Sequence, residues 1–322
     1  MRFNLEPGKR VWPQIRRHLP HYLMLLPVLV WLFIFCYIPM SGLLIAFVDF
    51  NPLLGLDATG KNPNFIRGIL RSEWVGFKWF IYIFRNPEFL NALKNTLLIN
   101  LYNLIFSFPA PLILALLLNE CRAVLYKRVV QTVSYLPHFV SWAIIGGLLN
   151  SLLSPSKGII NQVITMLGSE SIYFMGEPSW TRTIFVTSGI WKGIGWGSIL
   201  YLAALTSISQ ELYESAMLDG AGKLKQIRHI TLPGISYLIT MQLIFWVAGF
   251  LEVGFEQAFN IVNPATYSTG MVTNLYIYRN SFIQLKFSYP TAAGLLFSVI
   301  GMTLMIIANN ATRKINPDGA IW

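Results

Sequence analysis

A polar segment between two apolar runs has the most specific residue spacing in this 322-residue chain. Its spaced residues are Glu214, Ser215, Ala216, Asp219, Gly220, Ile230, Leu232 and Pro233. Glu214 is expected to open a short helix, because a carboxylate is favoured at the positive end of the helix dipole. Ala216 and Gly220, four residues apart, would share one face and keep that helix thin. Leu232 and Pro233 should end the segment, because the residue before a proline is disfavoured in the helical region. These residues offer no covalent chemistry, but a thin helix outside a bilayer could bind in a groove of a soluble partner protein.

A lysine and two aromatic residues in another apolar run are candidates for lining a path through a membrane. Lys192 is about ten residues into the run, roughly 15 Å deep at 1.5 Å per residue, and charges at such depth are usually functional. Trp196 follows one turn later on the same face, so a cation–π contact or a sugar-stacking platform is available. Tyr201 lies further along. A stripe of small residues beside them, typical of close helix packing, consists of Gly189, Gly193 and Gly197.

Two carboxylates, Glu252 and Glu256, lie four residues apart near the outer end of the next apolar run. One interpretation is structural, with one of them neutralising Lys192 inside a helix bundle. The other is that both line a polar path. The sequence leaves the two interpretations open.

The elements that must position these residues are membrane-spanning helices. Only 12% of the residues are charged and 54% are hydrophobic, a composition typical of membrane proteins. Runs with almost no charge are long enough to cross the hydrocarbon core, which takes about 20 residues. The six predicted spans are 22–48, 95–118, 129–153, 183–205, 236–257 and 287–310. The sequence therefore predicts an all-α, six-span transmembrane domain over 22–310, preceded by an N-terminal segment 1–21 and followed by a C-terminal tail 311–322.

The distribution of basic residues predicts the orientation in the membrane. The N-terminal segment, 119–128, 206–235 and the C-terminal tail together hold 13 of the 24 lysines and arginines. Basic residues are enriched in cytoplasmic loops. Both termini and the segment from Glu214 to Pro233 are therefore expected on the cytoplasmic side of the cell membrane.

The remaining loops, 49–94, 154–182 and 258–286, are expected on the outer side. The aromatic stretch 74–80 is interpreted as a helix lying at the membrane interface, with docking of an external partner as the alternative. In the last outer loop, Asn274, Tyr278 and Arg279 could meet an external binding protein or a sugar, although a solvated loop face is the simpler interpretation.

The polar segment from Glu214 to Pro233 resembles the coupling motif of permease subunits in binding-protein-dependent ABC importers. Its pattern is E-x-A, then three residues, G, nine residues and I-x-L-P. Further stretches resemble the carbohydrate-importer permeases of the polysaccharide subgroup. They are residues 91–96, Tyr135-Leu136-Pro137, Trp196-Gly197, 201–205, Leu212-Tyr213-Glu214 and Asp219-Gly220-Ala221. The sequence departs from the family pattern at Ser215, where alanine is usual, and at Ser236 and Tyr237, where a second proline often follows.

This resemblance implies a six-span bundle of the type I importer kind with a cytoplasmic coupling helix. It also implies a second homologous permease, a cytoplasmic ATPase dimer and an external solute-binding protein as partners, besides membrane lipid. ATP and Mg would be bound by the ATPase, so this chain would need no cofactor and would not be an enzyme. The implied function is import of an oligosaccharide.

Other functions are disfavoured by the sequence. The histidines at 18, 21, 138 and 229 have no metal-ligand spacing, so no metal site is expected. Basic residues are scattered, which argues against nucleic acid as a partner. A secondary transporter or channel without an ATPase remains the alternative, although the two halves have no evident inverted repeat. The outer loops carry more lysines and arginines than acidic residues, and together with Lys192 they favour an acidic substrate such as an alginate- or pectin-derived uronate.

Overall fold

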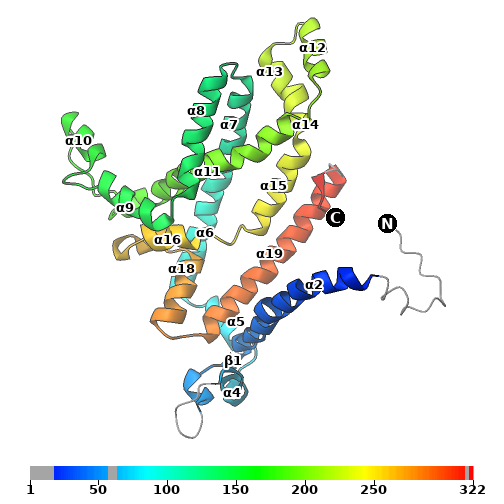
Figure 1. The fold of residues 1–322 in the computed structure, drawn as a ribbon. Helices are drawn as coiled ribbons and strands as arrows, with labels where there is room; N and C mark the ends of the chain where they lie inside the picture. Colours follow the sequence, from blue (N-terminus) through cyan, green and yellow to red (C-terminus); the bar gives the residue numbers. More distant parts are fainter. Residues whose placement is uncertain (1–17, 57–63, 316–318, 322) are drawn as a thin grey trace, which may run out of the picture. The chain divides into compact units, whose positions relative to one another are not determined.

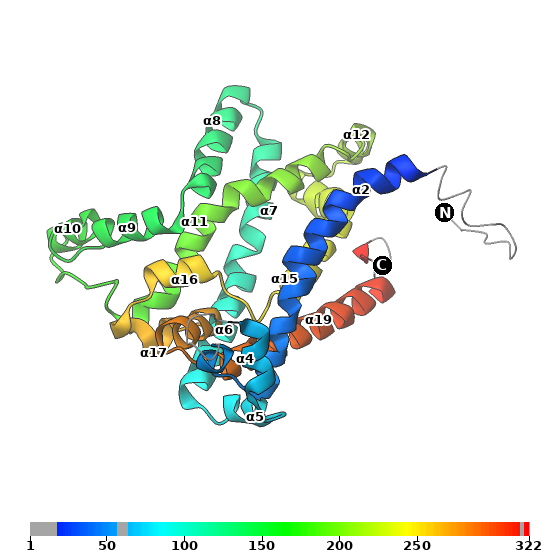
Figure 2. The same cartoon turned by 60° about the horizontal axis from the view of Figure 1, so that its bottom comes forward.

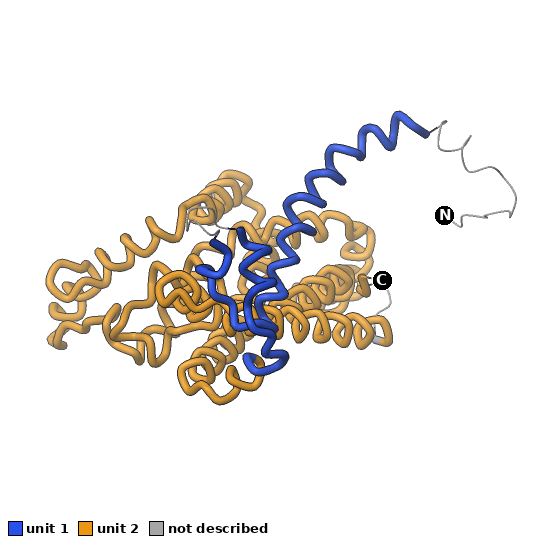
Figure 3. Tube along the Cα trace, turned by 90° about the horizontal axis from the view of Figure 1, so that it is seen from below, with its two compact units in different colours: residues 1–79 blue, residues 80–322 orange. Residues whose placement is uncertain are grey.

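The structure, a computed structural model, describes residues 18–56, 64–315 and 319–321. The chain divides into two compact units, Met1–Trp79 and Phe80–Trp322 (Figure 3). Most of the predicted N-terminal segment, residues 1–17, lies outside the described residues.

Unit 1 begins with one long helical stretch made of several types of turn: α2 (Leu19–Leu32), η1 (Phe33–Tyr37), α3 (Ile38–Met40) and η2 (Ser41–Phe47). Its remaining elements are β1 (Val48–Asp49), η3 (Pro52–Gly55), α4 (Phe65–Arg71), β2 (Glu73–Trp74) and the start of α5 (Lys78–Ile83). The strands pair antiparallel, with Val48 opposite Trp74. The stretch 74–80, predicted as one interfacial helix, is therefore divided between a strand and a helix.

Unit 2 is built from helices of very different lengths (Figure 1). Those up to the long central helix are α6 (Pro87–Tyr102), η4 (Asn103–Ser107), α7 (Pro109–Glu120), α8 (Val124–Tyr135), η5 (Leu136–Phe139), α9 (Trp142–Leu152), α10 (Ile159–Met166) and α11 (Pro178–Leu205). Those after it are α12 (Gln210–Leu218), α13 (Lys223–Gln226), η6 (Ile227–Thr231), α14 (Leu232–Gly234), α15 (Ser236–Ala248), α16 (Phe255–Ile261), η7 (Pro264–Thr266), α17 (Tyr267–Gly270), α18 (Thr273–Tyr278), η8 (Arg279–Ile283) and α19 (Ser288–Ile315).

Prolines shape several of these helices. The π-helical turns η1, η4 and η6 each end two residues before a proline, at Pro39, Pro109 and Pro233. A proline has no N–H and its ring crowds the carbonyl four residues earlier. In a π-turn an N–H instead donates to the carbonyl five residues earlier, as where Phe108 N donates to Asn103 O at 2.8 Å just before Pro109. These prolines therefore alter the helices locally without ending them.

Three helical stretches are long and apolar enough to cross a membrane: Leu19–Phe47, Pro87–Glu120 and Ser288–Lys314. Two bent pairs would raise this number to five, among the described residues, if each pair is one span. They are Val124–Phe139 with Trp142–Leu152, bent by 105°, and Lys223–Gly234 with Ser236–Ala248, bent by 64°. The predicted fourth span lies in α11, where glycines, serines and Lys192 dilute the apolar residues.

The predicted third and fifth spans are not single straight helices. Residues 129–153 include the sharp bend between η5 and α9, and α15 ends at Ala248, well before residue 257.

The core of unit 2 is organised around α11, which packs against α7 and α8 (Figures 1 and 2). One buried cluster joins α11 to α6, α16 and α18 through residues that include Ile99, Phe185 and Val272. A second joins α11 to α7 and α15 through Ala115, Tyr201 and Leu238. The α7–α8 connection and the helices α12 and α13 lie at one end of unit 2, and α18 with the start of α19 lies toward the other (Figure 1).

Candidate functional site

The helix that carries Glu214 is α12, and it begins earlier than the sequence predicted. Ser209 is its N-cap, with the side-chain hydroxyl accepting from Glu211 N at 3.3 Å. Glu211 is the acidic residue of the first turn, so it is Glu211 that faces the positive end of the helix dipole. The prediction that Glu214 opens the helix is wrong, and Glu214 instead lies exposed on the second turn.

Gly220 forms the C-terminal cap of α12. Its φ is +75°, and its N–H donates to Met217 O at 3.1 Å while Ala221 N donates to Ala216 O at 2.8 Å. This pair of bonds is the Schellman motif, which needs a left-handed residue that glycine adopts without strain. The helix ends at Leu218. The prediction that Ala216 and Gly220 share a helix face is therefore wrong, and Gly220 serves to turn the chain sharply.

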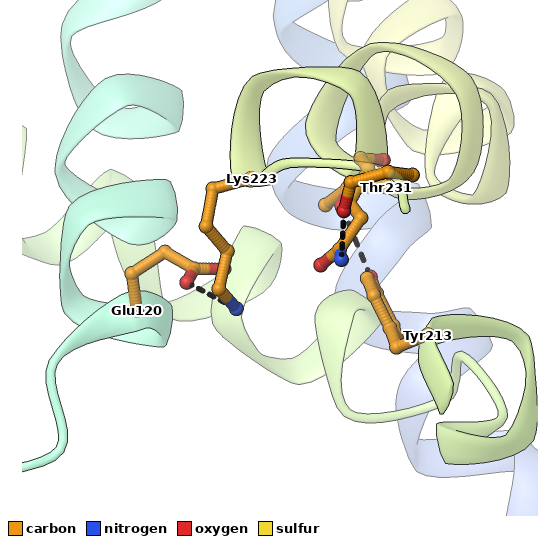
Figure 4. A network of polar contacts seen from close by, with 6 residues as sticks. Glu120, Tyr213, Lys223 and Thr231 are labelled. Carbon is orange, nitrogen blue, oxygen red and sulfur yellow. Dashed lines mark hydrogen bonds and ion pairs between the residues drawn. The ribbon is translucent and has the colours of Figure 1, made fainter. Parts of the chain in front are cut away.

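A network of polar contacts ties α12 and α13 to the transmembrane part (Figure 4). Tyr213 and Thr231 share a hydrogen bond between their hydroxyls at 3.0 Å. Thr231 is 2% exposed and also donates to Gln226 O at 3.4 Å. Lys223 forms an ion pair of 2.8 Å with Glu120 at the end of α7. Tyr213 therefore connects α12 to η6, and Lys223 connects α13 to α7.

The end of this segment exposes apolar side chains. Leu218 is 90% exposed and Leu224 is 84% exposed, on either side of the Gly220 turn. Ser215 and Asp219 lie exposed beside them, and Ala216 is half-buried. Ile230 and Leu232 are half-buried on η6 and α14.

Pro233 does not end the segment, contrary to the sequence prediction. The helix continues to Gly234, and the 64° bend follows between Gly234 and Ser236.

Lys192 is bound to the backbone of the bent pair α8–α9. Its Nζ donates to His138 O at 2.8 Å, to Pro137 O at 3.4 Å and to Val140 O. These carbonyls lie at the bend between η5 and α9, and that of Pro137 also accepts from Val140 N at 3.2 Å. The ammonium also lies 5.6 Å from the ring centroid of Trp142. Because an ammonium has three donors, Lys192 is saturated by this arrangement.

The cation–π contact that Lys192 makes is with Trp142, and Trp196 packs elsewhere. Its indole stacks on the His138 imidazole, with ring centroids 4.5 Å apart and 4° between the planes, and meets Phe139 edge-on. The tightest glycine of α11 is Gly195, where an added Cβ would lie 2.1 Å from Ser134 O. Of the predicted stripe, Gly197 abuts Pro111 closely, whereas Gly193 has open space. Packing of α11 on α8 therefore depends on a glycine outside the predicted stripe.

The other path candidates lie apart from Lys192. Tyr201 is 4% exposed in the cluster with Ala115 and Leu238. Glu252 lies in the break between α15 and α16, and Glu256 lies in the first turn of α16. Both carboxylates are exposed. Within the described residues, neither is within ion-pair distance of Lys192, so the predicted neutralisation is replaced by the three carbonyls.

The outer-loop candidates take part in local packing. Asn274 Nδ2 donates to Val253 O at 3.2 Å. Tyr278 packs against Phe255 and Phe259, with centroids 5.0 and 5.5 Å away. Arg279 lies 4.6 Å above the Tyr267 ring and donates to its hydroxyl. Arg279 also lines a cavity of about 280 Å³ with Glu88, Asn91 and Gln284, so it is the outer-loop candidate that a ligand can reach.

Residues 107–317 match the family described as the binding-protein-dependent transport system inner membrane component. The chain belongs to this family. The permease is 43% identical to the protein LplB of Bacillus subtilis (strain 168) over 298 residues, which is 92% of this chain and 90% of that protein. It is 40% identical over 317 residues to the polygalacturonan/rhamnogalacturonan transport system permease protein YteP of the same organism, covering 98% of this chain and 95% of YteP.

Solved structures resemble the permease along its whole length. A crystal structure of a bacterial ABC transporter involved in the import of the acidic polysaccharide alginate matches with a TM-score of 0.85 and 39% identity, over 96% of this chain and 100% of that chain. A second, of the bacterial alginate ABC transporter in complex with alginate pentasaccharide-bound periplasmic protein, matches with a TM-score of 0.85 and 38% identity, over 95% and 98%. The predicted family and the predicted type I importer permease fold are thereby confirmed. The permease is a transport subunit and not an enzyme.

Sequence reasoning missed several residues of this site. Tyr213, Thr231 and Glu120 were not singled out, although Tyr213 precedes Glu214 directly. Their contacts cross between separate helices, and such contacts leave no periodic signal in the sequence. Arg182, counted only among the basic residues of an outer loop, lies inside α11.

Proposed function

We propose that this permease is the membrane-spanning subunit of an ATP-driven importer of acidic oligosaccharides. It would pair with a second homologous permease to enclose the sugar path, and α12 would bind in a groove of a cytoplasmic ATPase dimer. The observation that carries the proposal is the exposed α12–Gly220 turn joined to η6 and α7 by the contacts of Tyr213 and Lys223.

ATP hydrolysis would be coupled to transport by displacement of α12 as a rigid helix. Leu218 and Leu224 present apolar surface that a groove of the ATPase could bury. Closure of the ATPase dimer on ATP would then move α12, and the Tyr213–Thr231 hydrogen bond would pass the movement to η6. Because η6 continues through α14 to the bend before α15, a small displacement at α12 would reorient a transmembrane helix.

The acidic substrate class is supported by the relatives. YteP is named for polygalacturonan and rhamnogalacturonan, and the matched crystal structures concern alginate. All of these polymers contain uronic acids, whose carboxylates are charged at neutral pH. A net charge of +10 on this chain suits attraction of such anions.

The delivery side is proposed to be the end of unit 2 that carries α16 and α18. One of the matched crystal structures is a complex of the alginate transporter with a substrate-bound periplasmic protein. For this permease an external solute-binding protein would dock there, near Asn274, Tyr278 and Arg279. Both termini and α12 would lie on the cytoplasmic side of the cell membrane.

Reconstitution tests the proposal. The complete transporter, with its second permease, ATPase and binding protein, is placed in proteoliposomes and offered tetragalacturonate, an alginate tetramer and maltotetraose. ATP-dependent uptake of at least one uronate oligosaccharide, and not of maltotetraose, is expected. Uptake of uronates without ATPase subunits would contradict the proposal and favour a secondary transporter, and exclusive uptake of maltotetraose would contradict the substrate class.

A further inference from the structure

A cavity of about 520 Å³ lies where α11 faces α6 and η4. Its wall on α11 carries Ser179, Arg182, Thr183 and Thr187, and the facing wall carries Tyr102 and Phe106. Residues 179, 183 and 187 follow at intervals of four, so their hydroxyls form one stripe along the helix. Hydroxyls, an aromatic wall and a single cation are the groups that bind an acidic sugar ring.

Arg182 carries a charge that no carboxylate of the described chain neutralises. The ion pairs in that part of the chain join Lys78 to Asp49 and Lys223 to Glu120. Arg182 Nη2 donates to Asn95 Oδ1 at 3.0 Å, whereas its Nε is buried and has no hydrogen-bond partner. Buried donors are normally satisfied, so this guanidinium is suited to a further anionic partner from outside the chain.

Asn95 fixes the orientation of the guanidinium. Its side chain is fully buried, and Nδ2 donates to Ser268 O at 3.0 Å and to Met271 O at 3.2 Å. These two carbonyls determine which way the amide points, so Oδ1 must face Arg182. The hydrogen bond from Nη2 to Asn95 thus fixes the orientation of the planar guanidinium. Because the group is rigid, the directions of its other N–H groups are fixed as well.

The cavity suits an aqueous path better than a lipid-facing groove. Arg182 lies about 6 Å along α11 from its first residue, at 1.5 Å per residue. A cation exposed to hydrocarbon there, beside a stripe of hydroxyls, would be costly. Lys192, further along the same helix, cannot substitute because its three donors are occupied.

We propose that Arg182, positioned by Asn95, binds the carboxylate of a uronate residue as the oligosaccharide passes this wall of the path. The bidentate fit of a guanidinium to a carboxylate would discriminate uronates from neutral sugars. The stripe of hydroxyls from Ser179 to Thr187 would hydrogen-bond the sugar hydroxyls, and Tyr102 and Phe106 would contact the ring. This inference rests on the proposed import of acidic oligosaccharides.

A first experiment measures the cavity without any substrate. In the assembled transporter in nanodiscs, with Cys36→Ser and Cys121→Ser, the exposed Thr187 is replaced (Thr187→Cys) and treated with an anionic or a cationic methanethiosulfonate. The anionic reagent is expected to react faster. Adding Arg182→Gln, which keeps a donor for Asn95, should lower the anion-to-cation rate ratio about tenfold.

The control is Arg85→Gln, which removes the same charge from an exposed position before α6 and should leave the rate ratio unchanged. Absence of reaction with either charged reagent would place the cavity in lipid and overturn the proposal. If Arg85→Gln lowered the rate ratio as much as Arg182→Gln, the preference for the anionic reagent would come from the overall charge of the protein and not from Arg182. That result would also overturn the proposal.

A second experiment measures uptake by the complete transporter, using a uronate tetramer that the wild-type complex takes up. Arg182→Gln is expected to reduce kcat/KM about tenfold or more, and Arg182→Lys to restore part of it. Arg85→Gln should retain wild-type uptake. Wild-type uptake by Arg182→Gln would overturn the role of Arg182 while leaving the proposed function standing. Failure of the wild-type complex to transport any uronate would instead refute the proposed function, and the reagent ratios would still report whether Arg182 makes the cavity electropositive.

Discussion

At the scale of single residues, Gly220 acts through its backbone conformation rather than through its small size. No atom lies within 4 Å of a Cβ built there, yet φ is +75°. A left-handed conformation costs an ordinary L-residue about 1–2 kcal/mol, and asparagine tolerates it best after glycine. Gly220→Val should therefore impair coupling to the ATPase more than Gly220→Ala, and Gly220→Asn least.

The measurement is the affinity of the permease complex for its purified ATPase, together with uptake. Gly222→Ala provides a matched control, because Gly222 has φ of −69° and open space around it, so it should bind and transport like wild type. Equal losses for Gly220→Asn and Gly220→Val would point to a steric contact with the ATPase instead of backbone strain.

Lys192 was expected from the sequence to line the path or to pair with a glutamate, and its contacts favour a structural role. Lys192→Met would remove the ammonium that donates to the carbonyls of Pro137, His138 and Val140. A hydrogen bond to a charged group is worth about 1.5–3 kcal/mol, so the assembled complex should unfold at a lower temperature. Uptake of the uronate tetramer should fall in proportion to the loss of assembled complex.

Thermal unfolding of the purified complex, followed by size-exclusion chromatography, measures this effect. Lys94→Met, which alters an exposed lysine on α6, should unfold like wild type. A Lys192→Met complex that unfolds like wild type but no longer takes up the uronate tetramer would restore the path interpretation.

At the scale of elements, the hydrogen bond between Tyr213 and Thr231 connects α12 to the π-turn that Pro233 imposes. Tyr213→Phe removes one hydroxyl and should cost about 1 kcal/mol of this coupling. We expect weaker stimulation of ATP hydrolysis by the loaded binding protein, with the complex still assembled. Thr231→Val should have a similar effect, and the double variant should lose little more than either one.

The stimulated ATPase rate measures this double-mutant cycle. Thr206→Val is the matched control, because the Thr206 hydroxyl donates only to Ala203 O in its own helix. Fully additive losses would mean that the two hydroxyls act independently and that the movement of α12 passes elsewhere.

The elements themselves could be predicted only in part. The length of the apolar runs indicated helices around 22–48, 95–118 and 287–310, because a bilayer requires continuous apolar helices. The bend after Phe139 could not be predicted, because it depends on Lys192, more than 50 residues away, to bind its carbonyls. The π-turns had a signal in Pro39, Pro109 and Pro233, but the register change follows from hydrogen bonds that only the structure displays.

The candidate site, too, could be predicted from the sequence only in part. The spacing from Glu214 to Pro233 indicated a docking element, whereas the assignment of Gly220 to a helix face failed because a glycine after a helix can equally be its cap. Arg182 escaped notice because it lies at the boundary that the charge pattern assigned to a loop. Its importance comes from Asn95, on a different helix.

At the scale of the whole chain, the charge asymmetry predicts which segments face the cytoplasm, and chemical labelling can test this prediction. The Glu120–Lys223 ion pair joins two segments predicted on the cytoplasmic side. Lys157 lies between α9 and α10, in a segment predicted on the outer side. Both Lys157 and Leu224 are exposed, with Leu224 84% exposed, so either position should react readily with a thiol reagent that can reach it.

In intact cells lacking the native cysteines, Lys157→Cys is expected to react with a membrane-impermeant maleimide, whereas Leu224→Cys should react only after permeabilisation. The reason is that lysines and arginines concentrate in the loops retained in the cytoplasm, and residues 206–235 are such a segment. Adding the purified ATPase to permeabilised membranes should then protect Leu224→Cys and leave Lys157→Cys reactive, because α12 and α13 would be covered by the bound subunit. Labelling of Leu224→Cys in sealed cells would place the α12–Gly220 turn outside, where no ATPase is available, and the coupling mechanism would fail with the topology.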